Sequence, residues 1–358
     1  MDVMNVMEMV DIRPLLPATV GAPAGLRRRR RGRLRIARWL APLLLAVGFT
    51  AVPAAPVAAA QPVPDTARPA PAVPGSTLAR FDRATAVAVD PQGRLYVSNA
   101  QRSAVVILNP DGSLRGTLGG PGTRTGQFAD PAGLDPTNGL ALWVADAGNG
   151  RLQQFSADGQ FLEALPLGLQ DDGTSSRQQQ PVFDATRNGV APLAEGEPIA
   201  VATTPANELF AIDARRSVVV KWDAQRRPER VIGGFGQRRG RLQHPVDLAL
   251  DANRLYVADR ERASILVYDL LGTYRRSIRL SDRTRLAAAR GLAVDSGRLW
   301  IATGSQVVTV STGAVGQRVA AEIDAPIVDL AVRRPDLYVL TESRLLRLAG
   351  AARTTADD

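Results

Sequence analysis

The 358-residue chain contains no cysteine, a single histidine (His244) and a single lysine (Lys221). Without cysteine, neither a disulfide framework nor a thiolate site is available. No serine lies in the Gly-x-Ser-x-Gly pattern that presents a nucleophile on a sharp turn. These absences argue against nucleophilic catalysis, so candidate functional groups have to be sought among the carboxylates and arginines.

Aromatic residues are also scarce, at 5% of the chain. The basic stretch 226–243 has few of the aromatic side chains on which nucleic-acid bases stack, so we do not expect nucleic acid as a partner. The formal net charge is +9, yet residues 1–60 carry nine arginines against three acidic residues. The remainder is therefore only mildly basic. Since all positively charged residues except Lys221 are arginine, a single arginine is weak evidence for a functional site.

Residues 1–60 have the features of a secretory signal. A basic segment precedes the apolar run Trp39–Thr50, and an Ala-x-Ala sequence ends at Ala60. The alternative is an uncleaved membrane anchor, although prolines interrupt the apolar stretch. In both cases the rest of the chain is exported to the periplasm or the extracellular space, and any membrane contact is made through this segment. A Pro/Ala-rich linker follows at 61–75 and is expected to be extended.

One sheet motif then recurs. In Gly126–Leu165, alternating apolar residues are separated by Asp, Asn, Gly and Pro, which indicates half-buried strands joined by tight turns. The second strand of this motif is found as "LYVSN" (95–99), "LWVAD" (142–146), "LFAID" (209–213), "LYVAD" (255–259), "LWIAT" (299–303) and "LYVLT" (337–341). Four of the spacings, 47, 46, 44 and 38 residues, match the period of a propeller blade, and the fifth, 67 residues, exceeds it. Six repeats therefore predict an all-β, six-bladed β-propeller over 76–350.

The sixth repeat lacks an outer strand, because only the polar tail 351–358 follows it. Residues Thr77–Phe81 ("TLARF") resemble the outer strands of the other repeats, so we expect this N-terminal strand to complete the last blade and close the ring. The extra length between units two and three is a polar loop, 168–195. It lies on the face where the inner strands begin, which we call the upper face, and loops this long are often functional.

The motif resembles the NHL repeat. The sequence "GQFADPAGL…LWVADAGNGRLQQF" follows that family's pattern at Gly126, Phe128, Pro131, Gly133, Asp146, Asn149 and Arg151. A second copy places Asp247 in the glycine position and Arg262 in the asparagine position. The resemblance covers nearly all of 76–350 and implies a propeller. NHL propellers include protein-binding, RNA-binding and lyase members, so the resemblance does not indicate one particular activity.

The single histidine bears on the lyase alternative. Propeller lyases of this general shape hold a metal with several histidines, which His244 alone cannot do. We expect His244 to be a loop residue at the entrance to an inner strand, immediately before Pro245.

Carboxylates near the upper ends of two inner strands form the first candidate site. Alignment of the inner strands matches Gly291 with Ala86, Gly133, Pro198, Asp247 and Asp329. Asp247, Asp329 and the neighbouring Glu197 could bind Ca²⁺ or another divalent cation, as in calcium-dependent lactonase propellers, or act as acid and base. The alternative, which we favour, is that they accept hydrogen bonds from arginines such as Arg290 and from channel water.

A rim of polar residues forms the second candidate site. Three residues after each second strand, the loop to the third strand carries Arg102, Asn149, Arg216, Arg262, Gln306 and Arg344. Arginines spaced around the upper face could bind an anionic partner bidentately, although solvated turn residues would give the same pattern.

Together these patterns favour a non-catalytic binding or scaffold module without a cofactor, which engages a protein or an anionic polymer of the cell envelope. The alternative is a metal-dependent lactonase or lyase that uses the channel carboxylates.

Overall fold

The computed structural model describes residues 75–136, 139–167, 196–234, 239–280, 287–312 and 317–352. All of them belong to one compact unit, Ala58–Asp358. The predicted signal or anchor, nearly all of the linker, loop 168–195 and most of the polar tail lie outside these residues. Within the described part of the chain, no helix has the length and apolarity needed to cross a membrane.

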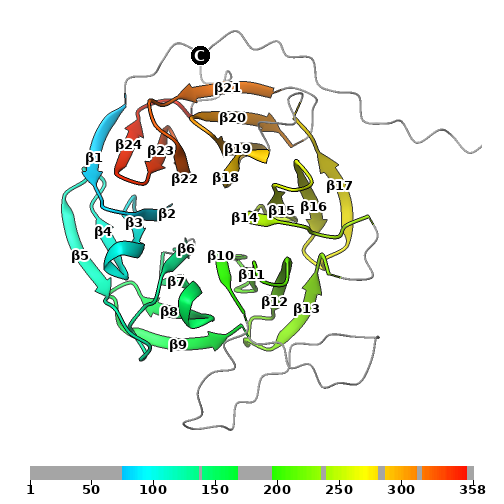
Figure 1. The fold of residues 1–358 in the computed structure, drawn as a ribbon, viewed down its shortest axis with the longest axis horizontal. Coiled ribbons are helices and arrows are strands. Elements are labelled where there is room, and N and C mark those ends of the chain that lie inside the picture. Colours follow the sequence, from blue (N-terminus) through cyan, green and yellow to red (C-terminus); the bar gives the residue numbers. More distant parts are fainter. Residues whose placement is uncertain are drawn as a thin grey trace, which may run out of the picture. The chain divides into compact units, whose positions relative to one another are not determined.

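Six sheets of four antiparallel strands surround a central axis, which confirms the predicted six-bladed propeller (Figure 1). The inner strands of blades one to six are β2 (Ala84–Val89), β6 (Pro131–Asp135), β10 (Pro198–Thr203), β14 (Pro245–Leu250), β18 (Ala289–Asp295) and β22 (Ile327–Arg333). The second strands are β3 (Leu95–Asn99), β7 (Ala141–Asp146), β11 (Leu209–Asp213), β15 (Arg254–Asp259), β19 (Arg298–Thr303) and β23 (Asp336–Thr341).

The third strands are β4 (Ala104–Leu108), β8 (Arg151–Ser156), β12 (Val218–Trp222), β16 (Ser264–Asp269), β20 (Gln306–Ser311) and β24 (Arg344–Leu348). The outer strands are β5 (Leu114–Gly119), β9 (Phe161–Pro166), β13 (Pro228–Ile232), β17 (Tyr274–Ile278), β21 (Gln317–Glu322) and β1 (Ser76–Arg80). Short 3₁₀ turns, η1 (Ala100–Arg102) and η2 (Ala147–Asn149), connect the second and third strands of blades one and two.

Blade six is built from both ends of the described chain. Strand β1 pairs antiparallel with β24, with Ser76 opposite Arg347 and Arg80 opposite Arg344. The sheet order is β1-β24-β23-β22, so the first strand lies beside the last three (Figure 1). Backbone hydrogen bonds therefore join the start of the ring to its end.

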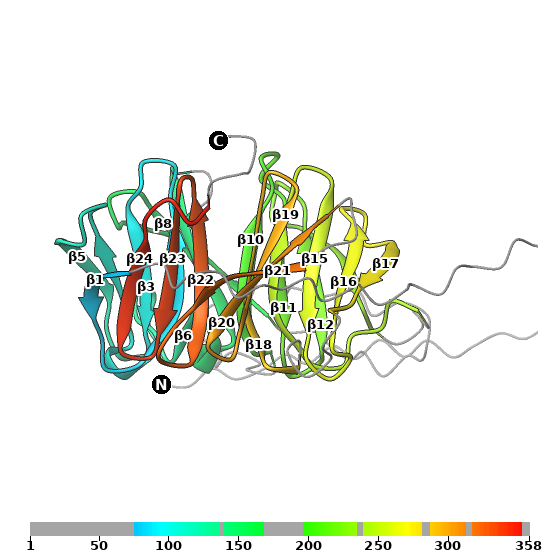
Figure 2. The ribbon, with the colours of Figure 1, turned by 90° about the horizontal axis from the view of Figure 1, so that it is seen from above.

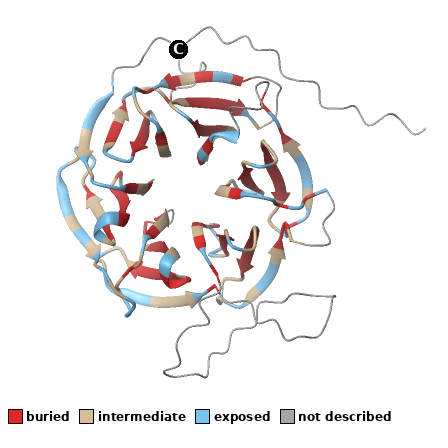
Figure 3. Cartoon of the chain, viewed as in Figure 1, coloured by how far each residue is buried: buried red, intermediate tan, exposed pale blue. Residues whose placement is uncertain are grey.

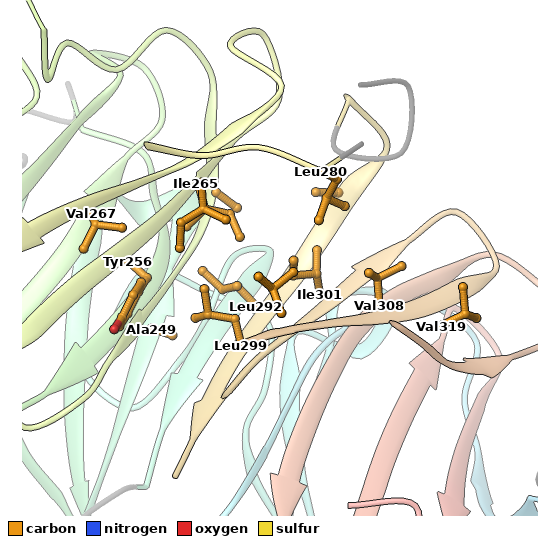
Figure 4. Packing of buried hydrophobic residues seen from close by; sticks show 14 residues of the cluster. Ala249, Tyr256, Ile265, Val267, Leu280, Leu292, Leu299, Ile301, Val308 and Val319 are labelled. Carbon is orange, nitrogen blue, oxygen red and sulfur yellow. The ribbon is translucent and has the colours of Figure 1, made fainter. Parts of the chain in front are cut away.

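The core consists of apolar layers between neighbouring blades. Second strands such as β3 and β11 are buried along their whole length, because each sheet packs against a sheet on both faces. The outer strands are more exposed and consist mostly of exposed and partly buried residues (Figure 3). Between blades four and five, Tyr256 and Ile265 pack against Leu292 and Ile301 (Figure 4). Each seam has such a cluster, so the blades stabilise one another.

The strands run along the ring axis, and their connections form two faces (Figure 2). The upper face carries the loops from second to third strands and the connections between blades. The lower face carries the turns from inner to second strands and from third to outer strands. Candidate site residues on the upper face therefore come from every blade.

Candidate functional site

Each inner strand has a register shift near its start, and this shift decides which residues are equivalent. In blade four, Pro245 is opposite Asp259 and Asp247 is opposite Ala258. In blade three, Pro198 is opposite Asp213 and Ala200 is opposite Ile212. The equivalent residues are therefore Ala86, Gly133, Ala200, Asp247, Gly291 and Asp329. The predicted match of Pro198 with Asp247 is wrong by two residues, because Pro198 is equivalent to Pro245.

Asp247 and Asp329 both lie at this inner level and connect neighbouring blades. Asp247 accepts hydrogen bonds from its own following amide, Leu248 N, at 2.8 Å, and from Leu292 N of blade five at 2.6 Å. Asp329 accepts from Leu330 N at 2.7 Å and from Val87 N of blade one at 2.8 Å. Main-chain amides thus occupy the positions in which arginine partners were expected.

Asp135 makes the corresponding contact in blade two. Its Oδ2 accepts hydrogen bonds from Thr203 N at 2.5 Å and Thr203 Oγ1 at 2.6 Å, in blade three. Blades two, four and six therefore each direct one carboxylate to an inner-strand amide of the next blade. The sequence prediction missed Asp135, although a signal was present: in the other five blades its position is held by Ala88, Ala202, Ala249, Ala293 and Ala331.

Small residues at these levels allow the inner strands to approach closely. A Cβ atom on Gly291 would lie 2.5 Å from Asp329 Oδ1, and one on Gly133 would lie 2.7 Å from Ala200 Cα. Burial raises the pKa of Asp329 to about 7, against the amide hydrogen bonds, which lower it. Burial and the charge of Asp329 raise the pKa of Asp247 well above its ordinary value. Both carboxyls therefore bind a proton more tightly in the folded state than in the unfolded chain.

Glu197 does not join this pair. It is exposed at the upper end of blade three, where its N–H donates to Asp213 Oδ1 at 3.2 Å and its carbonyl accepts from Ala214 N. It lies three residues before Ala200, so the expectation that it shares a level with Asp247 and Asp329 is wrong.

The described residues around Asp247 and Asp329 do not fit a divalent-cation site. Among the residues that the structure describes, no group of three or more His, Cys, Asp or Glu side chains could hold a metal ion. Ca²⁺ takes six to eight oxygen ligands, whereas both oxygens of Asp247 and of Asp329 already accept amide hydrogens.

His244 and Arg290 are exposed and lie near the upper ends of β14 and β18. The backbone N–H of His244 donates to Asp259 Oδ1 at 3.2 Å, and its carbonyl accepts from Arg260 N, which holds the loop. Arg290 occupies the register shift next to Gly291. Neither side chain caps a channel carboxylate in the described part of the chain.

The rim residues are positioned by the last residue of each second strand. The N–H groups of Arg102, Arg216 and Arg262 donate to the side chains of Asn99, Asp213 and Asp259, respectively. Arg344 N donates to Thr341 Oγ1 at 3.0 Å in the same way. Gln306 begins β20 of blade five at the equivalent place. These local turns place all the predicted rim residues on the upper face.

Asn149 differs from the rim arginines because its side chain is buried, with 8% exposure. Its Nδ2 donates to Asp146 Oδ2 at 2.8 Å and to Gly122 O at 2.9 Å. Asp146 also accepts from Ala129 N, Arg151 Nε and Gln153 Nε2. The markers of the NHL-like pattern in blade two therefore form a structural network, and Asn149 does not present a binding group, contrary to the prediction.

The rim arginines are not electrostatically equivalent. Arg102 pairs with the exposed Asp82 at 3.2 Å, and Arg344 pairs with the exposed Asp324. Arg216 instead pairs at 2.7 Å with Asp213, which is fully buried. A surface acid therefore neutralises the arginines of blades one and six, whereas the partner of Arg216 lies inside the protein.

A pocket of about 230 Å³ lies on the upper face at the seam of blades three and four. It is lined by Arg216, Ser217, Gly233, Gly234, Arg241, Leu242, Gln243 and Glu261. Arg262 borders this region and donates from Nη1 to Arg241 O at 2.8 Å. Two guanidinium groups and one exposed carboxylate thus line the pocket.

Comparisons with known proteins support the architecture. No protein-family model and no curated protein sequence matches the chain. A streptogramin B lyase is similar in structure, with a TM-score of 0.52, 10% identity, and coverage of 75% of this chain and 93% of that one. A gluconolactonase from Xanthomonas campestris has a TM-score of 0.52, 16% identity, and coverage of 76% and 87%. A catalytically inactive variant of virginiamycin B lyase from Staphylococcus aureus, with quinupristin, has a TM-score of 0.51, 11% identity, and coverage of 75% and 81%. At these identities the likeness shows a shared propeller fold.

Proposed function

We propose that the chain is an exported, NHL-type propeller that binds an anionic partner, a protein or a polymer of the cell envelope, on its upper face without catalysing a reaction. The observation that carries this proposal is the concentration of arginines around the pocket at the seam of blades three and four. Arg216 and Arg241 line the pocket, Arg262 donates to Arg241 O, and Arg215 and Arg239 lie within two residues of a lining residue.

The charge balance of the described loops supports the rim of blades three and four, which we call the sector, as the binding surface. Arg215, Arg239 and Arg241 are exposed, and the exposed acids in the described loops of blades three and four are Glu197 and Glu261. A guanidinium group binds carboxylate or phosphate through two parallel hydrogen bonds, and a cluster of them attracts anions over the distance of a Debye length. Blades one and six lack this excess because Asp82, Asp130 and Asp324 pair with Arg102, Arg83 and Arg344.

Charge reversal in this sector tests the proposal. With poly-L-glutamate as the probe and biolayer interferometry as the measurement, Arg241→Glu is expected to weaken binding by about tenfold or more, because it turns attraction into repulsion at the pocket. The matched control is Arg102→Glu, whose arginine is already paired with Asp82; it should change binding by less than about threefold. Equal losses of binding in both variants would contradict the location of the binding surface on blades three and four. Absence of binding by the unaltered protein would contradict the proposed binding function.

The enzyme alternative has support from the lyases and the gluconolactonase among the structural neighbours. It requires a cation or an acid–base pair in the channel, and the contacts of Asp247 and Asp329 supply neither a third ligand nor free carboxylate oxygens. We therefore expect millimolar Ca²⁺ or Mn²⁺ to leave the melting temperature unchanged. A cation at 100 times its Kd would add about 2.7 kcal/mol to the free energy of unfolding. This corresponds to a rise of several degrees in the melting temperature. A rise that Asp247→Asn abolishes would show a cation site at the channel and favour the enzyme alternative instead.

A further inference from the structure

A second and larger cavity lies on the ring axis toward the lower face, opposite the rim. Its volume is about 460 Å³, within the range of small-molecule sites. The wall is formed by the second halves of all six inner strands. The partly exposed apolar side chains of this wall are Leu134, Val89, Leu250, Val294 and Val332, whereas Val87, Val201, Leu248, Leu292 and Leu330 are almost fully buried between the blades. We call this cavity the funnel.

Charged residues surround the mouth of the funnel, and most are already paired. Asp90 accepts from Arg94 Nε at 2.5 Å, and Arg334 pairs with Asp295 across the seam of blades five and six. The two charges of each pair neutralise each other, so these residues leave little net charge to attract a ligand.

Arg333 is the exception at this mouth. It is exposed, and Nη2 donates to the carbonyl of Pro91 in blade one at 3.2 Å. No carboxylate partner of Arg333 is found in the part of the chain that the structure describes. A backbone carbonyl orients the guanidinium without cancelling its charge, so further N–H donors remain available for an anion.

The turn of blade one is shaped to accept this guanidinium. Gly93 has a φ of +86°, and a Cβ atom there would lie 3.3 Å from Pro110 Cγ and 3.4 Å from Arg333 Cζ. A glycine at this position therefore permits both the turn and the close approach of Arg333. The guanidinium is held at the entrance to the cavity by blade six and blade one together.

We propose that the funnel binds a small organic carboxylate, with its anionic group on Arg333 and its apolar body between the Val and Leu side chains of the inner strands. The planar fork of arginine matches a carboxylate, and the apolar wall favours burial of an alkyl or aryl body. The site is separate from the upper-face rim and does not depend on the partner that the rim binds.

The test compares octanoate with its neutral analogue octanamide by isothermal titration calorimetry on the full chain. Octanoate is expected to bind, and octanamide to bind about tenfold more weakly or worse, because only the carboxylate pairs with Arg333. Arg333→Gln should weaken octanoate binding by a similar factor, and Arg333→Lys should restore part of it. The control is Arg227→Gln, an exposed arginine on the lower face that pairs with Asp223 away from the funnel; its binding should be unchanged.

Three results would overturn the proposal: no octanoate binding at millimolar concentration, equal binding of octanamide, or unchanged binding by Arg333→Gln. Arg241→Glu, the upper-face variant, should bind octanoate normally. The experiments can therefore contradict the funnel proposal without contradicting the proposed function of the rim, and the reverse.

Discussion

Asp146→Ala is expected to lower the free energy of unfolding by about 3–5 kcal/mol, the usual cost of removing one partner of a buried ion pair. The Asp146 side chain is fully buried and pairs with Arg151 at 2.9 Å. The substitution would also remove the acceptor of Ala129 N–H and one of the two acceptors of Asn149 Nδ2 and of Gln153 Nε2. Unsatisfied buried donors add the cost of desolvation to the loss of the pair. The melting temperature should fall by roughly 10 °C.

The matched control for this prediction is Asp130→Ala. Asp130 also pairs with an arginine, Arg83, but both side chains are more than half exposed. Exposed pairs contribute about 0–1 kcal/mol, so this variant should melt within a few degrees of the unaltered protein. Chemical denaturation monitored by tryptophan fluorescence measures both. Similar losses in the two variants would show that burial of the Asp146 network does not set its contribution.

The protein is expected to be less stable at pH 7.5 than at pH 5, because of the channel carboxyls. The pKa of Asp329 is raised to about 7 from an ordinary value near 3.8, so the folded state holds a proton that the unfolded chain has lost. Stability therefore falls as the pH rises between these two values. One proton corresponds to about 1.4 kcal/mol per pH unit. Asp247, with its pKa also raised, adds to the fall.

Alanine substitution tests the origin of this slope. Ala86 and Ala200 occupy the equivalent level in blades one and three, so Asp247→Ala and Asp329→Ala introduce side chains that the ring already accommodates. The double variant should unfold with a free energy that is nearly constant from pH 5 to 7.5. His244→Gln is the control, since it replaces the single histidine and leaves both channel carboxyls in place, and it should retain the slope. A slope that survives the double variant would assign the effect to other groups.

The repeat was sufficient to predict the architecture because of how a propeller buries its strands. Each second strand is covered on both faces, so its apolar run recurs as "LYVSN" or "LWVAD" and can be counted. The rim could be predicted for a similar reason. In blades one, three, four and six, the Asp, Asn or Thr that ends the second strand accepts a hydrogen bond from the N–H three residues later, which is a local contact.

The channel could not be predicted in the same way. The register shift in the inner strands moved the equivalent residue of blade three from Pro198 to Ala200 and left Glu197 on the surface. Asp135, Asp247 and Asp329 all act through amides of the next blade, and Thr203, Leu292 and Val87 are 45 to 242 residues away along the chain. No spacing within a single repeat reports on such a partner.

The amino-acid order alone determined the number of blades, the second strands and the places of the rim residues, since these depend on burial pattern and turn chemistry within about 45 residues. Only the tertiary structure decided which charges are neutralised. Arg102 pairs with a surface acid, Arg333 has no carboxylate partner among the described residues, and the channel carboxyls accept hydrogen bonds from amides of neighbouring blades. The physical reason is distance: electrostatic and hydrogen-bond partners are chosen by proximity in the closed ring, which brings together residues from blades far apart in the chain.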